Sequence, residues 1–139
     1  MVMKTLILVV IVFTLGACCK GECEPTQGVL ISIRNLQAVD TDTVYMVRYK
    51  ANTGFAERLD TVKRFNPVPA GSTSPSTFME ELDFTNDWKV IIPAVNKEYF
   101  ISDFETVTER CSCTGDKYVR VKKFSLNNTV IESSSAILD

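Results

Sequence analysis

The sequence predicts an all-β domain, an antiparallel β-sandwich of immunoglobulin-like or transthyretin-like type with about seven or eight strands. After residue 28, no ten-residue stretch shows a convincing 3.6-residue apolar repeat, which argues against helices. Short alternating segments follow one another instead, and Gly, Pro and Asn residues divide them. The length of 139 residues allows one domain. A small β-barrel is the alternative architecture.

In the first half of the chain, alternation of apolar and polar residues predicts three strands, at 29–34, 43–50 and 58–65. Residues 51–54 are typical of a turn. The Pro-, Gly- and Ser-rich segment 66–75 is unsuited to a central strand, because proline cannot donate a ladder hydrogen bond. Phe78, Met79 and Leu82 fit either a single helical turn or an irregular edge strand.

The second half predicts four more strands, at 88–92, 98–108, 118–126 and 129–138. Pro93 ends the first of these. Asn127 and Asn128 form a good two-residue hairpin turn, because Asn tolerates positive φ. The alternation changes phase at Lys122 and Lys123, which predicts a β-bulge.

The first nineteen residues have the pattern of a secretory signal, with Lys4 as their only charge and an apolar segment behind it. The uncharged run, residues 5–19, would span roughly 22 Å as a helix, short of the ~30 Å hydrocarbon core. A permanent transmembrane helix is therefore the weaker interpretation.

The run ends in Leu15-Gly16-Ala17-Cys18, which resembles the lipobox of bacterial lipoproteins. The resemblance implies a diacylglycerol on Cys18, cleavage just before it and a further fatty acid, such as palmitate, on the new N-terminus. Residues 1–17 would then be a signal peptide, 18–28 the lipidated N-terminus and tether, and 29–139 a single β-sandwich domain. Two or more lipid chains anchor a protein stably. The expected location is the cell envelope at the outer membrane, on its periplasmic face or at the cell surface.

Four cysteines remain besides the lipidated one: Cys19, Cys23, Cys111 and Cys113. An even number in an exported chain suggests disulfides. A Cys111–Cys113 ring would be strained and a Cys19–Cys23 bridge would be local, which favours the two schemes that link the tether to the Cys-Ser-Cys segment. Alternatives are a four-thiolate zinc or Cu(I) site, whose spacing does not fit a zinc knuckle, and free thiols.

Composition argues against an enzyme, and we expect no catalytic residues and no cofactor. The absence of histidine excludes Ser-His-Asp and Cys-His catalysis. A net charge of −2 gives no reason to expect nucleic acid as a partner, and the glycines are too scattered for a phosphate loop. The densest acidic group should be a solvated loop, with a carboxylate-pair enzyme or a calcium site as alternatives: Glu80, Glu81, Asp83 and Asp87.

Three further sets of residues are candidate sites. Five basic residues should form a charge-alternating exposed face, with an anionic polysaccharide as the alternative partner: Arg110, Lys117, Arg120, Lys122 and Lys123. Four aromatic residues should be core, or else a ligand platform: Trp88, Tyr99, Phe100 and Phe104. Thr43 and Thr61 follow Asp and precede Val, which resembles an O-glycosylation signal of Bacteroidota, although a strand-entry position is the better explanation of each.

The run from Asp87 to Asp103, with the Cys-x-Cys segment and the Asn turn after it, is similar to small uncharacterised lipoproteins of Bacteroidota, a resemblance that implies no function. We expect a lipid-anchored envelope protein with a non-enzymatic binding or structural domain, whose partners are the membrane and an envelope protein or glycan. A glycan- or peptide-binding accessory lipoprotein for uptake is the first alternative, which exposed aromatics gathered on one face would favour. A metal or redox protein using the four cysteines is the second.

Overall fold

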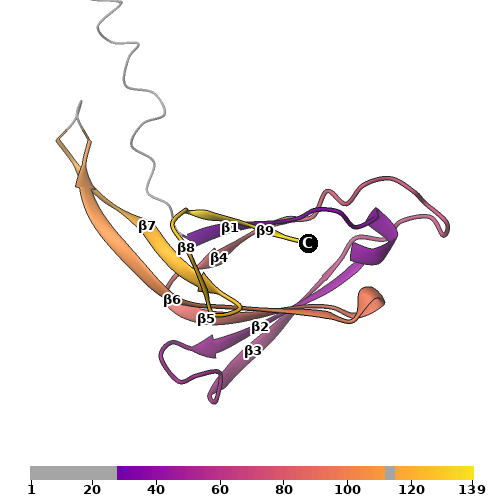
Figure 1. Cartoon of the computed structure of the whole chain (residues 1–139), viewed down its shortest axis with the longest axis horizontal. Helices are drawn as coiled ribbons and strands as arrows, with labels where there is room; N and C mark the ends of the chain where they lie inside the picture. The colour runs from indigo at the N-terminus through magenta and orange to yellow at the C-terminus, as the bar shows by residue number, and fades with distance from the viewer. Residues whose placement is uncertain (1–27, 112–114) are drawn as a thin grey trace, which may run out of the picture.

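Two β-sheets stack face to face in the computed structural model, which describes residues 28–111 and 115–139 (Figure 1). The three-stranded sheet has the order β4-β1-β9, and the six-stranded sheet has the order β3-β2-β5-β6-β7-β8. The two sheets do not close into a barrel, and the predicted β-sandwich is confirmed. The expectations for the signal peptide and for Cys18, Cys19, Cys23 and Cys113 fall outside the described residues.

The strands of the first half follow the sequence pattern closely. Their bounds are β1 Gly28–Ile33, β2 Thr43–Lys50, β3 Arg58–Phe65 and β4 Met79–Asp83. A short 3-10 helix, η1 (Ala38–Thr41), precedes β2. The segment around Met79 and Leu82 is thus an edge strand and not a helical turn, because β4 pairs antiparallel with β1 at the border of the smaller sheet.

The second half begins with β5 (Asn86–Ile92) and the 3-10 helix η2 (Pro93–Val95). A long hairpin follows, with β6 (Lys97–Arg110) and β7 (Lys117–Leu126) as its arms. Asn127 and Asn128 have φ of 49° and 65°, as the turn prediction requires. The predicted bulge is confirmed, because Glu105 pairs with Lys123 and Thr106 with Val121, leaving one extra residue of β7 between them.

The predicted last strand, 129–138, is wrong as a single element. It divides into β8 (Thr129–Ile131), on the edge of the larger sheet, and β9 (Ser135–Leu138), in the smaller one. The Ser133 hydroxyl accepts a hydrogen bond from the Ser135 amide at 3.1 Å where the chain crosses between the sheets. β9 then pairs with β1 in parallel, whereas the other described strand pairs are antiparallel.

The core lies between the two sheets, and alternation decides which side chains enter it. Val29, Ile31 and Ile33 of β1 are buried, whereas Leu30 between them is 40% exposed. Burying one such aliphatic side chain stabilises the fold by about 1.5–3 kcal/mol. The larger sheet contributes a matching set of buried side chains: Val44, Met46, Val90, Ile92, Ile101, Val121 and Phe124.

Polar contacts tie the two sheets together at their borders. The Trp88 indole donates a hydrogen bond to the Asp83 carbonyl at 2.9 Å, which joins β5 to the end of β4. The Tyr99 hydroxyl donates to the main-chain oxygen of Asp139, which follows β9. Desolvation by burial raises the pKa of this tyrosine, and the negative charge of Asp139 raises it further.

Candidate functional site

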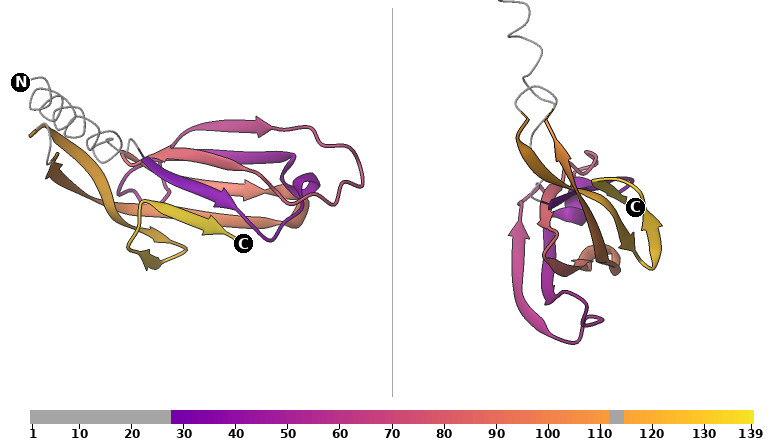
Figure 2. Two further views of the ribbon diagram at one scale, coloured as in Figure 1. Left: turned by 90° about the horizontal axis from the view of Figure 1, so that it is seen from above. Right: turned by 90° about the vertical axis from the view of Figure 1, so that its left-hand side faces the viewer.

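The outer face of the six-stranded sheet carries a group of aromatic side chains that the other sheet of the described residues does not cover. Figure 2 shows the three-stranded sheet lying over only one side of the larger sheet. Because Val44 and Met46 of β2 point into the core, the alternate residues Tyr45 and Tyr49 lie on the outer face. We define the aromatic face by five residues: Tyr45, Tyr49, Phe55, Phe65 and Phe100.

Three of these rings pack against one another. The ring centroids of Tyr49 and Phe55 are 5.3 Å apart at 79°, and those of Phe55 and Phe100 are 5.1 Å apart at 76°. Edge-to-face packing of this kind is a favoured aromatic geometry. Phe55 comes from the turn between β2 and β3, whereas its two partners come from β2 and β6. All three rings are half-buried, so each keeps an accessible part.

Phe55 holds its place in an unfavourable backbone conformation. Its φ is +64°, which is rare for a bulky residue and costs on the order of 1–3 kcal/mol. The turn is held by the Thr53 hydroxyl, which donates to the Lys50 carbonyl at 2.7 Å, and by the Asn52 amide, which donates to the Asp87 carboxylate at 3.1 Å. The surrounding structure therefore fixes the position of this ring.

Asp87 anchors the turn from beneath. Its side chain is 4% exposed, and desolvation by burial raises the pKa of its carboxyl, while hydrogen bonds from the Asn52 and Asp103 amides act in the opposite direction. The expectation that Asp87 belongs to a solvated acidic loop is therefore wrong. The alternation of β5 places Asp87 beside the β2–β3 turn, and the turn is distant from Asp87 along the chain.

The other acidic residues of that predicted group do not converge. Glu80 binds Arg64 of β3 through two hydrogen bonds of 2.6 and 3.1 Å, across the open side between the sheets. Hydrogen bonding to Glu80 raises the pKa of the Arg64 guanidinium, and desolvation by burial has only a small opposite effect. The Asp83 carboxylate accepts hydrogen bonds from Thr85 and Asn86. Among the described residues, no His, Cys, Asp or Glu side chains form a group that could hold a metal ion.

Lysines are interleaved with the aromatic rings. The Lys63 ammonium lies 5.8 Å from the centroid of Tyr45 and 5.4 Å from that of Phe65, which is 63% exposed. The Lys89 ammonium lies 5.1 Å from the centroid of Phe100. At exposed sites each such cation–π contact contributes about 0.5–1 kcal/mol. The contacts therefore hold the lysines close to the rings.

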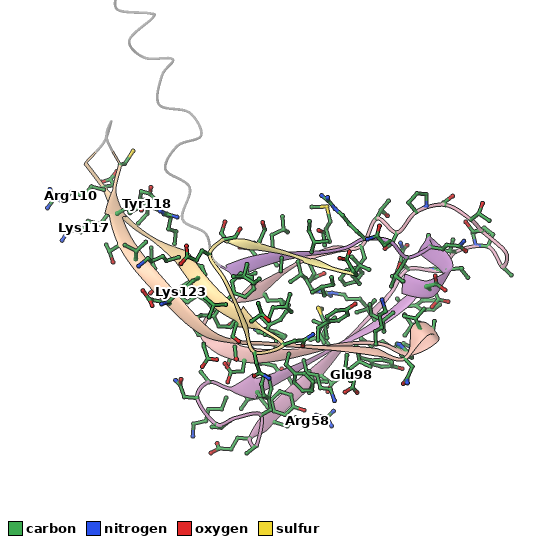
Figure 3. The ribbon with its side chains drawn as sticks, in the orientation of Figure 1. Arg58, Glu98, Arg110, Lys117, Tyr118 and Lys123 are labelled. Carbon is green, nitrogen blue, oxygen red and sulfur yellow. The ribbon has the colours of Figure 1, made fainter. Side chains whose placement is uncertain are left out.

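The aromatic face is more basic than the chain as a whole, whose net charge is −2. Lys89 is paired with Glu98 at 2.8 Å. Lys63 and Arg58 have no acidic partner within the described part of the chain, and Arg58 donates its hydrogen bond to the Thr61 hydroxyl. Figure 3 shows Arg58 and Glu98 on the side of the larger sheet that faces away from the three-stranded sheet.

Of the four aromatic residues predicted from the sequence, only Phe100 lies on this face. Trp88 and Tyr99 are core residues, and Phe104 stacks on buried Phe124 with centroids 6.0 Å apart. The other members of the aromatic face were missed. The alternation in 43–50 already separates Tyr45 and Tyr49 from the core positions, but their proximity to Phe100 depends on the strand order.

A second surface with exposed apolar side chains lies on the outside of the smaller sheet. Leu30, Met79 and Ile137 are exposed there and line a shallow groove of about 300 Å³. Register explains their proximity, because Ser32 pairs with Met79 on one side and Ile137 on the other. This surface lacks aromatic rings apart from half-buried Phe78 at its border.

The predicted basic face lies on the β6–β7 hairpin, and much of it is ion-paired. Glu109 binds Arg120 at 2.6 Å, and Glu105 binds Lys123 at 2.7 Å and Lys122 at 3.3 Å. Hydrogen bonds from these cations lower the pKa of both glutamates. The predicted charge-alternating strand surface is therefore present around Glu105 and Glu109.

The remaining candidates are placed only in part. Cys111 is buried and disulfide-bonded, and it is the only cysteine within the described ranges, so no disulfide joins two described residues. Thr43 begins β2, and Thr61 is an exposed residue within β3. Across 28–111 and 115–139, no helix is long and apolar enough to cross a membrane.

Comparison with known proteins adds no family assignment. No protein-family model, no curated protein and no solved structure matches this chain.

Proposed function

We propose that this chain is a lipid-anchored envelope protein whose β-sandwich is a non-enzymatic binding module, with the aromatic face as a glycan-binding surface. The observation that supports the proposal most directly is the gathering of five aromatic residues, from β2, β3, β6 and the β2–β3 turn, on the outer face of the larger sheet, away from the other described sheet. The proposal of an anchor rests on the lipobox-like sequence, and the proposal of a binding surface rests on the aromatic face.

The chemistry of this face suits a sugar chain. A pyranose ring has apolar C–H faces that lose water when they stack on an aromatic ring, and polar edges that need hydrogen-bond partners. Tyr45 and Phe65 offer such rings, and Lys63 and Thr61 place a donor and a hydroxyl beside them. The strained but anchored Phe55 adds a ring whose position is fixed before any ligand arrives, which reduces the entropic cost of binding.

The anchor in this proposal is Cys18, at the end of the lipobox-like Leu15-Gly16-Ala17-Cys18. Gly28, where β1 begins, is the tenth residue after Cys18, and a chain of ten such steps reaches at most about 36 Å. Metabolic labelling with a fatty-acid probe tests the anchor. We expect the native chain to be labelled and the Cys18→Ala variant to be unlabelled and released to the soluble fraction; label on the variant would overturn this assignment.

The binding surface is tested with the detergent-solubilised full chain on an array of neutral and acidic polysaccharides. We expect binding, and we expect Tyr45→Ala and Phe65→Ala each to weaken it about tenfold, equivalent to ~1.4 kcal/mol. Leu30→Ala and Met79→Ala are the matched controls, because they remove exposed apolar side chains from the outside of the other sheet.

Two results would contradict the glycan assignment. The first is a native chain that binds none of the polysaccharides. The second is binding that the control variants weaken as much as the aromatic variants do. Pull-down of an envelope protein in a manner that depends on Phe65 would instead assign the same face to a protein partner, since aromatic residues are also enriched in protein interfaces.

A further inference from the structure

The β6–β7 hairpin extends well beyond the smaller sheet. β6 has 14 residues and β7 has 10, whereas β1 has 6. Figure 1 shows the two arms rising from one end of the sandwich. Arg110 and Lys117, the last and first residues of the two arms, are directly paired across the hairpin. Figure 3 shows both side chains at its far end, pointing away from the sandwich.

The two faces of this projecting segment differ in charge. Glu109 lies on one face, where it binds Arg120 at 2.6 Å and accepts a hydrogen bond from Tyr118 at 2.9 Å. The alternate residues form the opposite face, and the described strand residues there include no acidic side chain: Thr106, Thr108, Arg110, Lys117, Val119 and Val121. Cations therefore occupy this second face without a neutralising carboxylate on the strands.

Two like charges directly opposite each other destabilise a strand pair. Arg110 and Lys117 are both exposed, and neither has an ion-pair partner within the described ranges. Residues 105–123 carry five basic and three acidic side chains, Asp116 included, whereas the whole chain is net −2. Val119, 37% exposed, adds an apolar group beside the cations. An anionic surface would relieve the repulsion at this end.

The hairpin is also at the end of the molecule where the anchor enters. β1 begins at Gly28, at the same end from which the hairpin rises, and the views in Figures 1 and 2 agree on this. Under the lipid anchor of the proposed function, at most about 36 Å of chain separates Gly28 from the membrane-bound Cys18. The projecting cations are therefore at the end of the sandwich that the tether would join to the membrane.

We propose that Arg110, Lys117 and Val119, on the projecting arms of β6 and β7, dock on the anionic lipid headgroups of the membrane that holds the anchor. This inference rests on the lipid anchor of the proposed function. A basic side chain near an anionic membrane surface contributes about 1 kcal/mol, which is a factor of about five in the ratio of docked to undocked molecules. Docking at this end would hold the sandwich in a defined orientation, with the aromatic face accessible beside the membrane.

The test reconstitutes the full lipidated chain into vesicles of phosphatidylcholine, with or without phosphatidylglycerol. A membrane-impermeant amine reagent and peptide mass spectrometry then measure the reactivity of Lys117. Lys97 is the internal reference, because it begins β6 at the opposite end of the same strand. We expect phosphatidylglycerol to protect Lys117 but not Lys97, and added salt to weaken the protection.

Arg110→Ala should lower the docked-to-undocked ratio read at Lys117 about fivefold. Arg34→Ala is the matched control, an exposed arginine just after β1 at the far end, and should leave the ratio unchanged. The docking proposal is overturned if Lys117 reacts equally in both kinds of vesicle, or if Lys97 is protected to the same extent. A chain that fails to associate with the vesicles at all would contradict the anchor instead, so the two failures are distinguishable.

Discussion

Adjacent residues Leu30 and Ile31 of β1 test the sandwich directly, because one points outward and the other into the core. Ile31 is fully buried, and truncation to alanine removes its packing and leaves a cavity between the sheets. Such Ile→Ala changes cost about 2–5 kcal/mol. Leu30 is 40% exposed, so truncation loses only part of a leucine's burial, about 1 kcal/mol, and opens no enclosed cavity.

The assay is urea unfolding of the intact chain followed by tryptophan fluorescence. Trp88 is the only tryptophan and is buried in the core, so its emission reports on the packing between the sheets. We expect Ile31→Ala to lower the midpoint strongly, Leu30→Ala to lower it slightly, and both to leave the slope unchanged, since the surface exposed on unfolding is nearly the same. Equal losses for the two variants would refute the assignment of β1 faces and indicate that the outer surface is covered in solution.

Three further outcomes are expected. Gly28→Ala should destabilise the β1–β4 pair, because the added Cβ would lie 2.0 Å from the Leu82 carbonyl oxygen; unchanged urea stability would contradict that contact. Burial raises the folded-state pKa of Asp87 above its unfolded value of about 4, so its contribution to stability is present below that pH and is lost as the pH rises through the folded pKa. The stability of Asp87→Asn relative to the native chain should therefore increase with pH, and a difference independent of pH would refute this reasoning. Finally, non-reducing peptide mapping should find the disulfide of Cys111 joined to the tether at Cys19 or Cys23; a link within the Cys-Ser-Cys segment would contradict the predicted pairing.

Asp87 and the two glutamates of the hairpin contribute to stability in opposite pH ranges, because their carboxyl pKa values shift in opposite directions. Desolvation dominates at buried Asp87 and raises its pKa. Glu105 is exposed and Glu109 is half-buried. Hydrogen bonds to cations lower the pKa of both, so their contribution to stability is present above the unfolded carboxyl pKa and is lost as the pH falls through the folded one. All three side chains are carboxylates, and their burial and their hydrogen-bond partners decide the direction of the pKa shift.

Strand positions were predictable because they depend on local information. Side chains of a strand alternate between its two faces, so the segments 43–50 and 58–65 could be assigned at their observed bounds. Asn127 and Asn128 marked a turn because Asn tolerates positive φ. The bulge at Lys122 was visible as a change of phase in the same alternation.

The sites were less predictable, because each depends on partners that are distant along the chain. No sequence signal marks Phe55 as a member of the aromatic face, since its place there depends on ring contacts with Tyr49 and Phe100. The division of 129–138 between two sheets follows from a crossing at Ser133 that lets β9 complete the smaller sheet beside β1. An alternating pattern cannot reveal to which sheet a strand belongs, because both sheets bury one face in the same core.

The sequence by itself determined an all-β chain with the approximate limits of most of its strands and most of its turns, because alternation and turn chemistry act over a few neighbouring residues. Strand order and register decided which side chains come together on each surface. They placed rings from β2, β3 and β6 together on the outer face of the larger sheet. They also put the ion-paired glutamates on one side of the hairpin, and on the other side the cations that have no ion-pair partner among the described residues. These arrangements arise from long-range pairing, which is fixed only when the two sheets close on a shared core.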